Sequence, residues 1–254
     1  MTTTPAIPAS EGIALGVDVG GTGMKAAPVR IADGTLVADR HRIPTPRPAT
    51  PAAVAEVVGE LVSHFGWTGP VGVALPSVVR HGIVRSAANI DPTWIDTDAA
   101  HLFGAVLDRP VTVLNDADAA GLAEMAHGAG RDRGGVVIML TFGTGIGSAL
   151  FVDGHLVPNT ELGHLEFRGD SIERWAAASA RERDDLGWSA WASRVNDVLA
   201  AVERLFSPDL IILGGGVSKK AERWVPHLVA GCEVAVAHSA NSAGIVGAAM
   251  AAAG

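Results

Sequence analysis

The chain has 254 residues, of which 48% are hydrophobic and 18% are charged, and its formal net charge is −8. This composition is typical of a globular protein with a core and excludes a disordered chain. The acidic balance argues against binding to nucleic acid or to an anionic membrane surface, so a polyanionic ligand would need a local basic patch. The single cysteine, Cys232, excludes an internal disulfide framework and a cysteine-ligated zinc site.

The N-terminal residues 1–12 have no hydrophobic periodicity and are expected to form a flexible tail. They lack the basic start and apolar centre of a signal peptide. No run in the chain approaches the apolar length of a membrane span. We therefore expect a cytoplasmic protein that does not bind membranes.

The first half of the chain predicts alternating strands and helices. Thr50 is suited to the N-cap of a helix, and Pro51 to its first turn. Asp33-Gly34 is a hairpin turn between two strands. Strands are expected at residues 13–19, 25–30, 36–43, 71–75 and 111–114, and helices at residues 51–65 and 117–126.

The second half repeats this order. A strand at residues 136–140 breaks at a glycine-rich turn, returns at residues 148–152 and turns again at Asp153-Gly154. The repetition indicates an internal duplication, with two phosphate loops facing each other across a cleft; a chance likeness of two hairpins is the alternative. Three elements follow: a long helix at residues 188–205, a strand with a glycine turn at 210–213, and a small-residue segment suited to close helix packing at 242–249. The tryptophans of the long helix are interpreted as core or interface residues rather than as a platform for a ligand.

The first glycine-rich turn follows Asp18, which ends the opening strand. Three glycines within four residues allow backbone N–H groups to approach an anion without a Cβ in the way. Asp18 could hold a cation or its water, and Lys25 adds positive charge nearby. The pattern predicts a phosphate site beside a metal-holding acid, with a plain hairpin turn as the alternative. Neither the Walker A spacing nor the dinucleotide fingerprint occurs here.

Three predicted strands end in glycine turns, after Val19, Leu140 and Leu213, and a fourth ends in Asn115-Asp116. Ligands of open α/β folds lie at the carboxyl ends of strands, so these turns fit a ligand with several phosphates or with a phosphate and a base. Asp116 is the candidate general base, because phosphoryl transfer uses an aspartate to accept the acceptor's proton. Asp118 is interpreted as a helix N-terminal acid stabilised by the dipole.

Residues 159–166 place an asparagine, two glutamates and a histidine within eight positions. Such a cluster can form hydrogen bonds with a polyhydroxylated ligand. Glu161, His164 and Glu166 are also acceptable metal ligands, which is the alternative. Their spacing does not match the H-E-x-x-H arrangement of zinc enzymes.

These motifs, in this order, resemble the ROK-family sugar kinases, and within them the polyphosphate glucokinase branch and the polyphosphate/ATP glucomannokinase type. The resemblance covers nearly the whole chain after the tail and rests on residues 18–25, 115–121, 140–147, 158–164 and 214–218. It implies an α/β fold, the duplicated actin-like or ribonuclease H-like ATPase fold, with two lobes around a cleft. The smaller lobe would comprise residues 13–116 and 241–254, and the larger one residues 117–240.

The resemblance implies transfer of a phosphoryl group from inorganic polyphosphate or ATP to glucose, with mannose as a second candidate. Asp116 would be the catalytic base for the sugar 6-hydroxyl, and Asp18 would act through Mg²⁺, held by way of water. The hexose would be bound by Asn89, Asn115, Asp116, Glu161, His164 and Glu173, the last placed by the motif of residues 171–175. The phosphate donor would be bound by Asp18, Gly20, Gly21, Thr22, Lys25, Thr144, Gly145 and Gly215.

The chain departs from most of the family between residues 166 and 171, where the cysteine-rich zinc loop of other members is missing. We therefore expect no zinc. No helix-turn-helix precedes Ile13, which argues against the repressor branch, and the resemblance implies a homodimer. A basic track for polyphosphate could use Arg80, Arg85, Arg131, Arg133, Lys219, Lys220 and Arg223, each of which could equally be a solvated surface charge.

Two other classes of function compete with the kinase. A sugar-binding sensor would keep the fold without catalysis, although Asp18, Asp116 and all three glycine turns are intact. An actin-like ATPase acting on a protein partner would leave Glu161 and His164 without a purpose.

Overall fold

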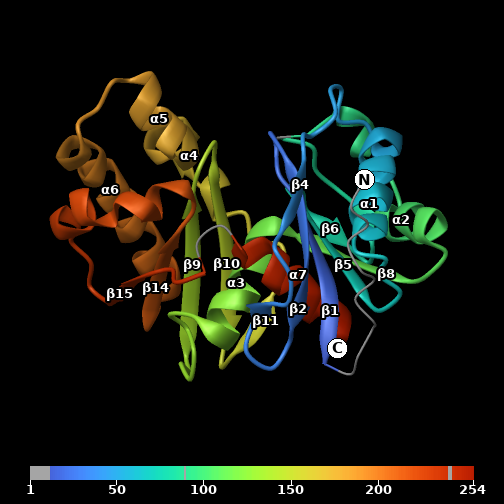
Figure 1. The fold of residues 1–254 in the computed structure, drawn as a ribbon. Coiled ribbons are helices and arrows are strands. Elements are labelled where there is room, and N and C mark those ends of the chain that lie inside the picture. Colours follow the sequence, from blue (N-terminus) through green and yellow to red (C-terminus); the bar gives the residue numbers. More distant parts are fainter. Residues whose placement is uncertain (1–11, 89, 240–241) are drawn as a thin grey trace. The chain divides into compact units, whose positions relative to one another are not determined.

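The computed structural model describes residues 12–88, 90–239 and 242–254. They form two compact units (Figure 1), which are described separately below. Unit 1 comprises the described residues up to Ala123 together with Ser242–Gly254, and unit 2 the described residues of Glu124–Asn241. The division lies inside helix α3 (Asp116–His127), whereas the predicted lobe limit follows the first residue of that helix.

Unit 1 contains a mixed sheet with the order β3-β2-β1-β5-β8, in which β4 also pairs with β2. β1 is antiparallel to β2 and parallel to β5, which is parallel to β8. The strands are β1 (Ile13–Val19), β2 (Met24–Arg30), β3 (Thr35–Leu36), β4 (His41–Ile43), β5 (Val71–Leu75) and β8 (Val111–Asn115), with a small hairpin of β6 (Val79–Arg80) and β7 (Ile83–Val84). The other helices are α1 (Pro51–His64), 3₁₀-helix η1 (Pro92–Trp94), α2 (Ala99–Leu107) and α7 (Ala243–Ala253).

Unit 2 contains a sheet with the order β11-β10-β9-β14-β15. Its strands are β9 (Val136–Phe142), β10 (Ile146–Val152), β11 (His155–Val157), β14 (Leu210–Gly214) and β15 (Glu233–Val236), with a hairpin of β12 (Glu166–Phe167) and β13 (Asp170–Ser171). Its helices are α4 (Ile172–Ala176), α5 (Ala178–Arg183) and α6 (Trp188–Phe206), and its 3₁₀-helices are η2 (Leu162–His164), η3 (Gly216–Arg223) and η4 (Val225–His227).

The two sheets have the same strand order and the same strand directions. β1 pairs antiparallel with β2 and parallel with β5, which pairs parallel with β8. In the same way, β9 pairs antiparallel with β10 and parallel with β14, which pairs parallel with β15. The predicted internal duplication is confirmed at this level. The single strand predicted at residues 36–43 is wrong: β3 and β4 pair with opposite ends of β2 and are separated by residues 37–40. Helix α2 and strand β15 were not predicted.

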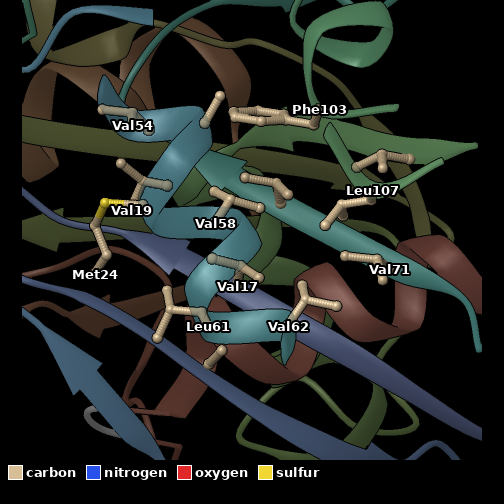
Figure 2. Packing of buried hydrophobic residues seen from close by; sticks show 14 of the residues in the cluster. Val17, Val19, Met24, Val54, Val58, Leu61, Val62, Val71, Phe103 and Leu107 are labelled. Carbon is tan, nitrogen blue, oxygen red and sulfur yellow. The ribbon is translucent and has the colours of Figure 1, made fainter. Parts of the chain in front are cut away.

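The main core of unit 1 lies between the sheet and helices α1 and α2. Because successive strand residues point to opposite faces, Val17 and Val19 of β1 share this core. Figure 2 shows Val54, Val58 and Leu61 of α1 packed over them. Thr50 caps α1 by accepting a hydrogen bond from the N–H of Ala53 at 3.4 Å, as predicted.

Helix α7 packs on the opposite face of this sheet, directly against the strand backbones. A Cβ on Gly16 or Gly72 would overlap a backbone carbonyl of α7, and one on Gly247 would overlap the carbonyl of Ala119 in α3. Ala74 and Ala248 also meet here. The small residues of the C-terminal segment therefore allow the close helix packing that was predicted.

The core of unit 2 surrounds the buried Trp191 of α6. Its ring lies 5.8 Å from that of Phe142 and 4.9 Å from that of Trp224, measured between centroids. The indole N–H donates to the carbonyl of Ala176 at 3.0 Å. The core position predicted for this tryptophan is confirmed, whereas Trp188 is only partly buried. Among the described residues, no helix is long and apolar enough to cross a bilayer.

Two stacked imidazoles make a testable contribution to stability. His41 of β4 and His64 of α1 stack with their centroids 3.7 Å apart and 6° between planes. Burial lowers the pKa of His41, and the neighbouring His64 lowers it further. The unfolded chain therefore binds more protons than the folded one below about pH 6.5, so stability falls as the pH falls through that range.

We expect the free energy of unfolding to depend less on pH in His41→Gln than in the wild type. The difference between pH 7.5 and 5.5 should shrink by less than about 1 kcal/mol, because the imidazole is partly exposed. Urea denaturation at pH 7.5 and 5.5 measures it, with His155→Gln as the control because that histidine is exposed at the start of β11. Equal pH dependence in the wild type and in His41→Gln would contradict the expectation.

Candidate functional site

The first glycine-rich turn, residues 20–23, connects β1 to β2 in unit 1. Two of its carbonyls are bonded to side chains of the segment that follows β3. Thr45 Oγ1 donates to the carbonyl of Gly20 at 2.5 Å, and Arg42 Nη2 donates to the carbonyl of Thr22 at 2.8 Å. The turn is therefore supported by Arg42 of β4 and by Thr45, which follows that strand.

Asp18 lies at the end of β1, and Lys25 faces it from β2. Lys25 Nζ is 3.5 Å from Asp18 Oδ2. Burial raises the pKa of Asp18, while the charges of Lys25 and Arg40 lower it. The carboxylate packs against the first turn of α7, since a Cβ on Gly244 would lie only 3.0 Å from the Cγ of Asp18. A carboxylate held in this way is suited to a hard cation or its water.

Asn115 and Asp116 stand at the junction of β8 and α3. Asn115 Oδ1 accepts the N–H groups of Ala117 and Asp118 at 2.8 and 3.0 Å, so its side chain caps α3. Its Nδ2 donates to the carbonyl of Ser77 at 3.1 Å. This leaves one amide hydrogen for the hexose contact predicted for Asn115. The cap holds Asp116, half-buried, at the start of the helix.

The register of the sheet places Asp18 and Asp116 at the same edge. Asp18 is paired with Ala74 of β5, and Ala74 with Leu114 of β8, so β1 and β8 end together with one strand between them. Because two strand spacings lie between them, the ends of β1 and β8 are about 10 Å apart. The carboxyl ends of the parallel strands of unit 1 thus carry the predicted metal-holding acid and the predicted base.

The second glycine turn lies between β9 and β10 in unit 2. Ser179, at the start of α5, donates its hydroxyl to the carbonyl of Thr144 at 2.6 Å and its N–H to the carbonyl of Gly143 at 3.1 Å. A Cβ on Gly145 would overlap the carboxylate of Glu173. The turn is therefore held by α5 on one side and by Glu173 on the other.

Glu161, His164 and Glu173 come together in unit 2. His164 Nδ1 is 3.5 Å from Glu161 Oε2, and His164 Nε2 is 3.7 Å from Glu173 Oε1. Burial raises the pKa of Glu161; the charge of His164 lowers it and that of Glu173 raises it. The structure thus gathers three of the predicted sugar-binding side chains, including the glutamate located by the motif of residues 171–175.

The local chain explains why this cluster forms. Ser148 of β10 donates its hydroxyl to the carbonyl of Thr160 at 2.7 Å and accepts the N–H of Leu162 at 3.0 Å. Gly163 lies so close to the backbone of Ile146 that a Cβ would overlap its carbonyl. These contacts bind the turn that carries Glu161 and His164 to the strand leaving the second glycine turn.

No group of three or more His, Cys, Asp and Glu side chains within the described ranges is placed to hold a metal ion. The alternative metal site of Glu161, His164 and Glu166 is therefore wrong. Glu166 is exposed on β12, while His164 lies between Glu161 and Glu173.

The third glycine turn follows β14. Gly215 has a φ of +85°, and a Cβ there would overlap the backbone of Phe142, so only glycine fits. Ser218 donates its hydroxyl to the carbonyl of Gly215 at 2.9 Å. Because Gly214 of β14 pairs with Thr141 of β9, the second and third glycine turns lie at the same edge of the sheet.

Several cations of the suggested polyphosphate track have acidic neighbours. Arg85 pairs with Asp96 at 2.5 Å, and Arg133 with Glu233 at 2.5 Å. Arg131 and Arg223 lie beside the acids next to them in sequence, and Lys220 lies 5.8 Å from the ring of Trp188. These pairings favour the interpretation of solvated surface charges for Arg85 and Arg133.

The predicted site residues fall into two groups, each within one unit. Asn89 lies outside the described residues. Unit 1 carries Asp18, Gly20, Gly21, Thr22, Lys25, Asn115 and Asp116, and unit 2 carries Thr144, Gly145, Glu161, His164, Glu173 and Gly215. Sequence reasoning missed Arg42, Thr45 and Arg47 beside the first glycine turn. Arg42 and Arg47, which lie beside and within the proline-rich residues 44–48, were a signal that could have pointed to this segment.

The chain is similar to known proteins along most of its length. It is 53% identical over 237 residues to a polyphosphate glucokinase of Mycobacterium tuberculosis, covering 93% of this chain and 89% of the relative. It is 48% identical to the crystal structure of the inorganic polyphosphate/ATP-glucomannokinase from Arthrobacter sp. strain KM, with a TM-score of 0.91 over 94% of this chain and 98% of that one. The profile of the ROK family matches residues 14–177. The chain belongs to the ROK family, whose sugar kinases have the actin-like ATPase fold.

Proposed function

We propose that this enzyme is a glucokinase that transfers a phosphoryl group from inorganic polyphosphate or ATP to the 6-hydroxyl of glucose. The names of the similar proteins point to these substrates. The two groups of side chains described above supply what the reaction requires: backbone turns for phosphates, a polar cluster for a sugar and a carboxylate for the proton.

The position of Glu173 carries the proposal. Its Oε2 accepts the N–H of Ile146, at the end of the second glycine turn, at 3.1 Å, and its Oε1 faces His164. One carboxylate thus joins the proposed sugar-binding cluster to a proposed phosphate-binding turn. A sugar held by this cluster lies beside the donor, which is the positioning that phosphoryl transfer depends on.

Asp116 acts as the general base in this scheme. It accepts the proton of the 6-hydroxyl as the sugar oxygen forms a bond to the terminal phosphorus of the donor. The phosphoanhydride bond to that phosphorus breaks, which leaves ADP or a polyphosphate one unit shorter, and Asp116 then releases the proton to water. Asn115 supports the step by capping α3 and holding Asp116 at its start.

Mg²⁺ would be held by the donor phosphates and by Asp18, in part through water. Asp18 would be the one protein ligand among the described residues, and this suits Mg²⁺ because the ion usually keeps several of its waters. Bound there, it would neutralise charge on the phosphates. Lys25, at 3.5 Å from Asp18, opposes the rise that burial causes in the pKa of that carboxyl.

We expect the purified protein to form glucose 6-phosphate with Mg²⁺ and either long-chain polyphosphate or ATP. Product formation, measured separately with each donor, tests the proposal, and the same assay with mannose tests the second sugar. Activity with ATP alone would remove polyphosphate from the proposal. No product with either donor, in a protein that binds glucose by calorimetry, would contradict the kinase.

We also propose that the enzyme is a cytoplasmic homodimer, as the likeness to the family suggests. Sedimentation of the purified protein and fractionation of cells that express it test these two points.

A further inference from the structure

We propose that Arg47 contacts the phosphate chain of the donor at a subsite beside the first glycine turn. Arg42 and Thr45 are the positioning residues of this subsite. The inference rests on the proposed function, since it names a further residue for the binding of the same donor. The subsite would bind a linear chain of phosphates joined by anhydride bonds, which either polyphosphate or ATP can supply.

A pocket of about 330 Å³ opens beside this turn, entirely within unit 1. Gly20 and Gly21 form one wall, and the segment after β4 contributes Thr45 and Arg47. Pro76, at the end of β5, lies on another side. The pocket is therefore at the carboxyl ends of the parallel strands, next to the carboxylate proposed to hold Mg²⁺.

The turn presents donors rather than acceptors to a ligand. The carbonyls of Gly20 and Thr22 are occupied by Thr45 and Arg42. Within the described part of the chain, the N–H groups of residues 20–22 have no hydrogen-bond acceptor. Successive backbone N–H groups that lack an acceptor, in a turn with two engaged carbonyls, are suited to binding an anion.

The positively charged side chains around the turn have different partners. Lys25 faces Asp18, and Arg42 is bound to the turn itself, with its guanidinium packed against Gly23. Arg47 lines the pocket, and over the residues that the structure describes no carboxylate lies within ion-pair distance of it.

Asp91, the one carboxylate lining the pocket among the described residues, is engaged elsewhere. Its Oδ1 accepts the N–H of Thr93 at 2.9 Å and the hydroxyl of the same residue at 2.5 Å. These bonds lower the pKa of Asp91, which keeps it ionised on its own turn. The guanidinium of Arg47 is thus the group available to a phosphate, which it can bind in bidentate fashion.

The test compares Arg47→Gln and Arg47→Lys with Arg30→Gln as the matched control. Arg30 lies at the far end of β2 from the turn and pairs only with Asp33 among the described residues, at 3.0 Å. Two quantities are measured: the KM for each donor at saturating glucose, and the Kd for polyphosphate by calorimetry without glucose.

We expect Arg47→Gln to raise the donor KM and the polyphosphate Kd by about tenfold or more, because a charge-assisted phosphate contact is lost. Arg47→Lys should recover part of the loss. The KM for glucose and the unfolding midpoint should match those of the wild type and of the control. The slope of affinity against salt should also be shallower without the arginine.

Unchanged donor KM and polyphosphate Kd in Arg47→Gln would overturn the inference. A raised KM for glucose with an unchanged donor KM would overturn it as well, because the pocket would then serve the sugar. An effect on polyphosphate alone, or on both donors, supports it and identifies the phosphate chain bound. The calorimetric measurement needs no turnover, so it separates failure of this subsite from failure of the proposed reaction.

Discussion

Asp116→Asn is expected to lower kcat by about 10²–10⁴-fold with either donor, because the amide cannot accept the proton of the 6-hydroxyl. The substitution preserves the size of the side chain and its place at the start of α3. Asn115, which caps the helix, is untouched. The loss should therefore appear in the rate and not in stability. Steady-state kinetics with saturating glucose and donor measure it.

Glucose binding supplies the control for this variant. We expect the calorimetric affinity for glucose to change far less than kcat, since Glu161, His164 and Glu173 lie on unit 2. A variant that keeps its full rate of product formation would remove Asp116 from the role of base. A wild-type protein that binds glucose but turns over neither donor would favour the sensor. Phosphate release that ignores glucose and follows a protein partner would favour the actin-like ATPase.

Gly247→Ala is expected to destabilise the protein by about 3 kcal/mol or more, which is a fall in Tm on the order of 10 °C. A Cβ at this position of α7 would overlap the carbonyl of Ala119 in α3. Both partners are backbone, so no side chain can move aside to relieve the overlap. Helix propensity alone would predict the opposite sign, because alanine is favoured over glycine within a helix.

Gly59→Ala provides the matched control on α1 of the same unit. Its Cβ would lie 3.1 Å from the tip of Val106, a partly exposed side chain that can shift. We expect a change within about 1 kcal/mol, of either sign. Chemical denaturation of the two variants measures the difference. Equal midpoints for Gly247→Ala and the wild type would contradict the packing described for α7.

The candidate site was only partly predictable. Asp18, Asp116 and the three glycine turns follow strands that local hydrophobicity identifies, so their place at the carboxyl ends of strands could be inferred. That Glu173 joins His164 to the N–H of Ile146 could not, because the residues involved are separated by stretches whose path depends on packing. The pocket beside Arg47 depends likewise on how residues 40–49 fold back onto the first turn.

Helix α2 shows the same limit in the fold. Its predominantly apolar segment has no clear polar face, so periodicity did not identify it, and the structure defines it through the cap of Asp98 and the burial of Phe103. Similarly, the buried Glu124 accepts the N–H groups of Ala129, His238 and Ser239. A buried carboxylate with three backbone donors leaves no local signature, since two of its partners lie more than a hundred positions away.

The amino-acid sequence by itself determined the strands, the glycine breaks that follow them and the repetition of this pattern in two halves. These features arise from interactions between near neighbours in the chain, which hydrophobic periodicity and glycine placement encode directly. Only the tertiary structure decided that Gly16 and Gly72 are contact points for α7 and that Gly247 of α7 contacts α3. It also decided that Thr45 and Arg42 occupy carbonyls of the first turn. Such contacts join distant segments, and their geometry is set by the packing of whole elements rather than by local preference.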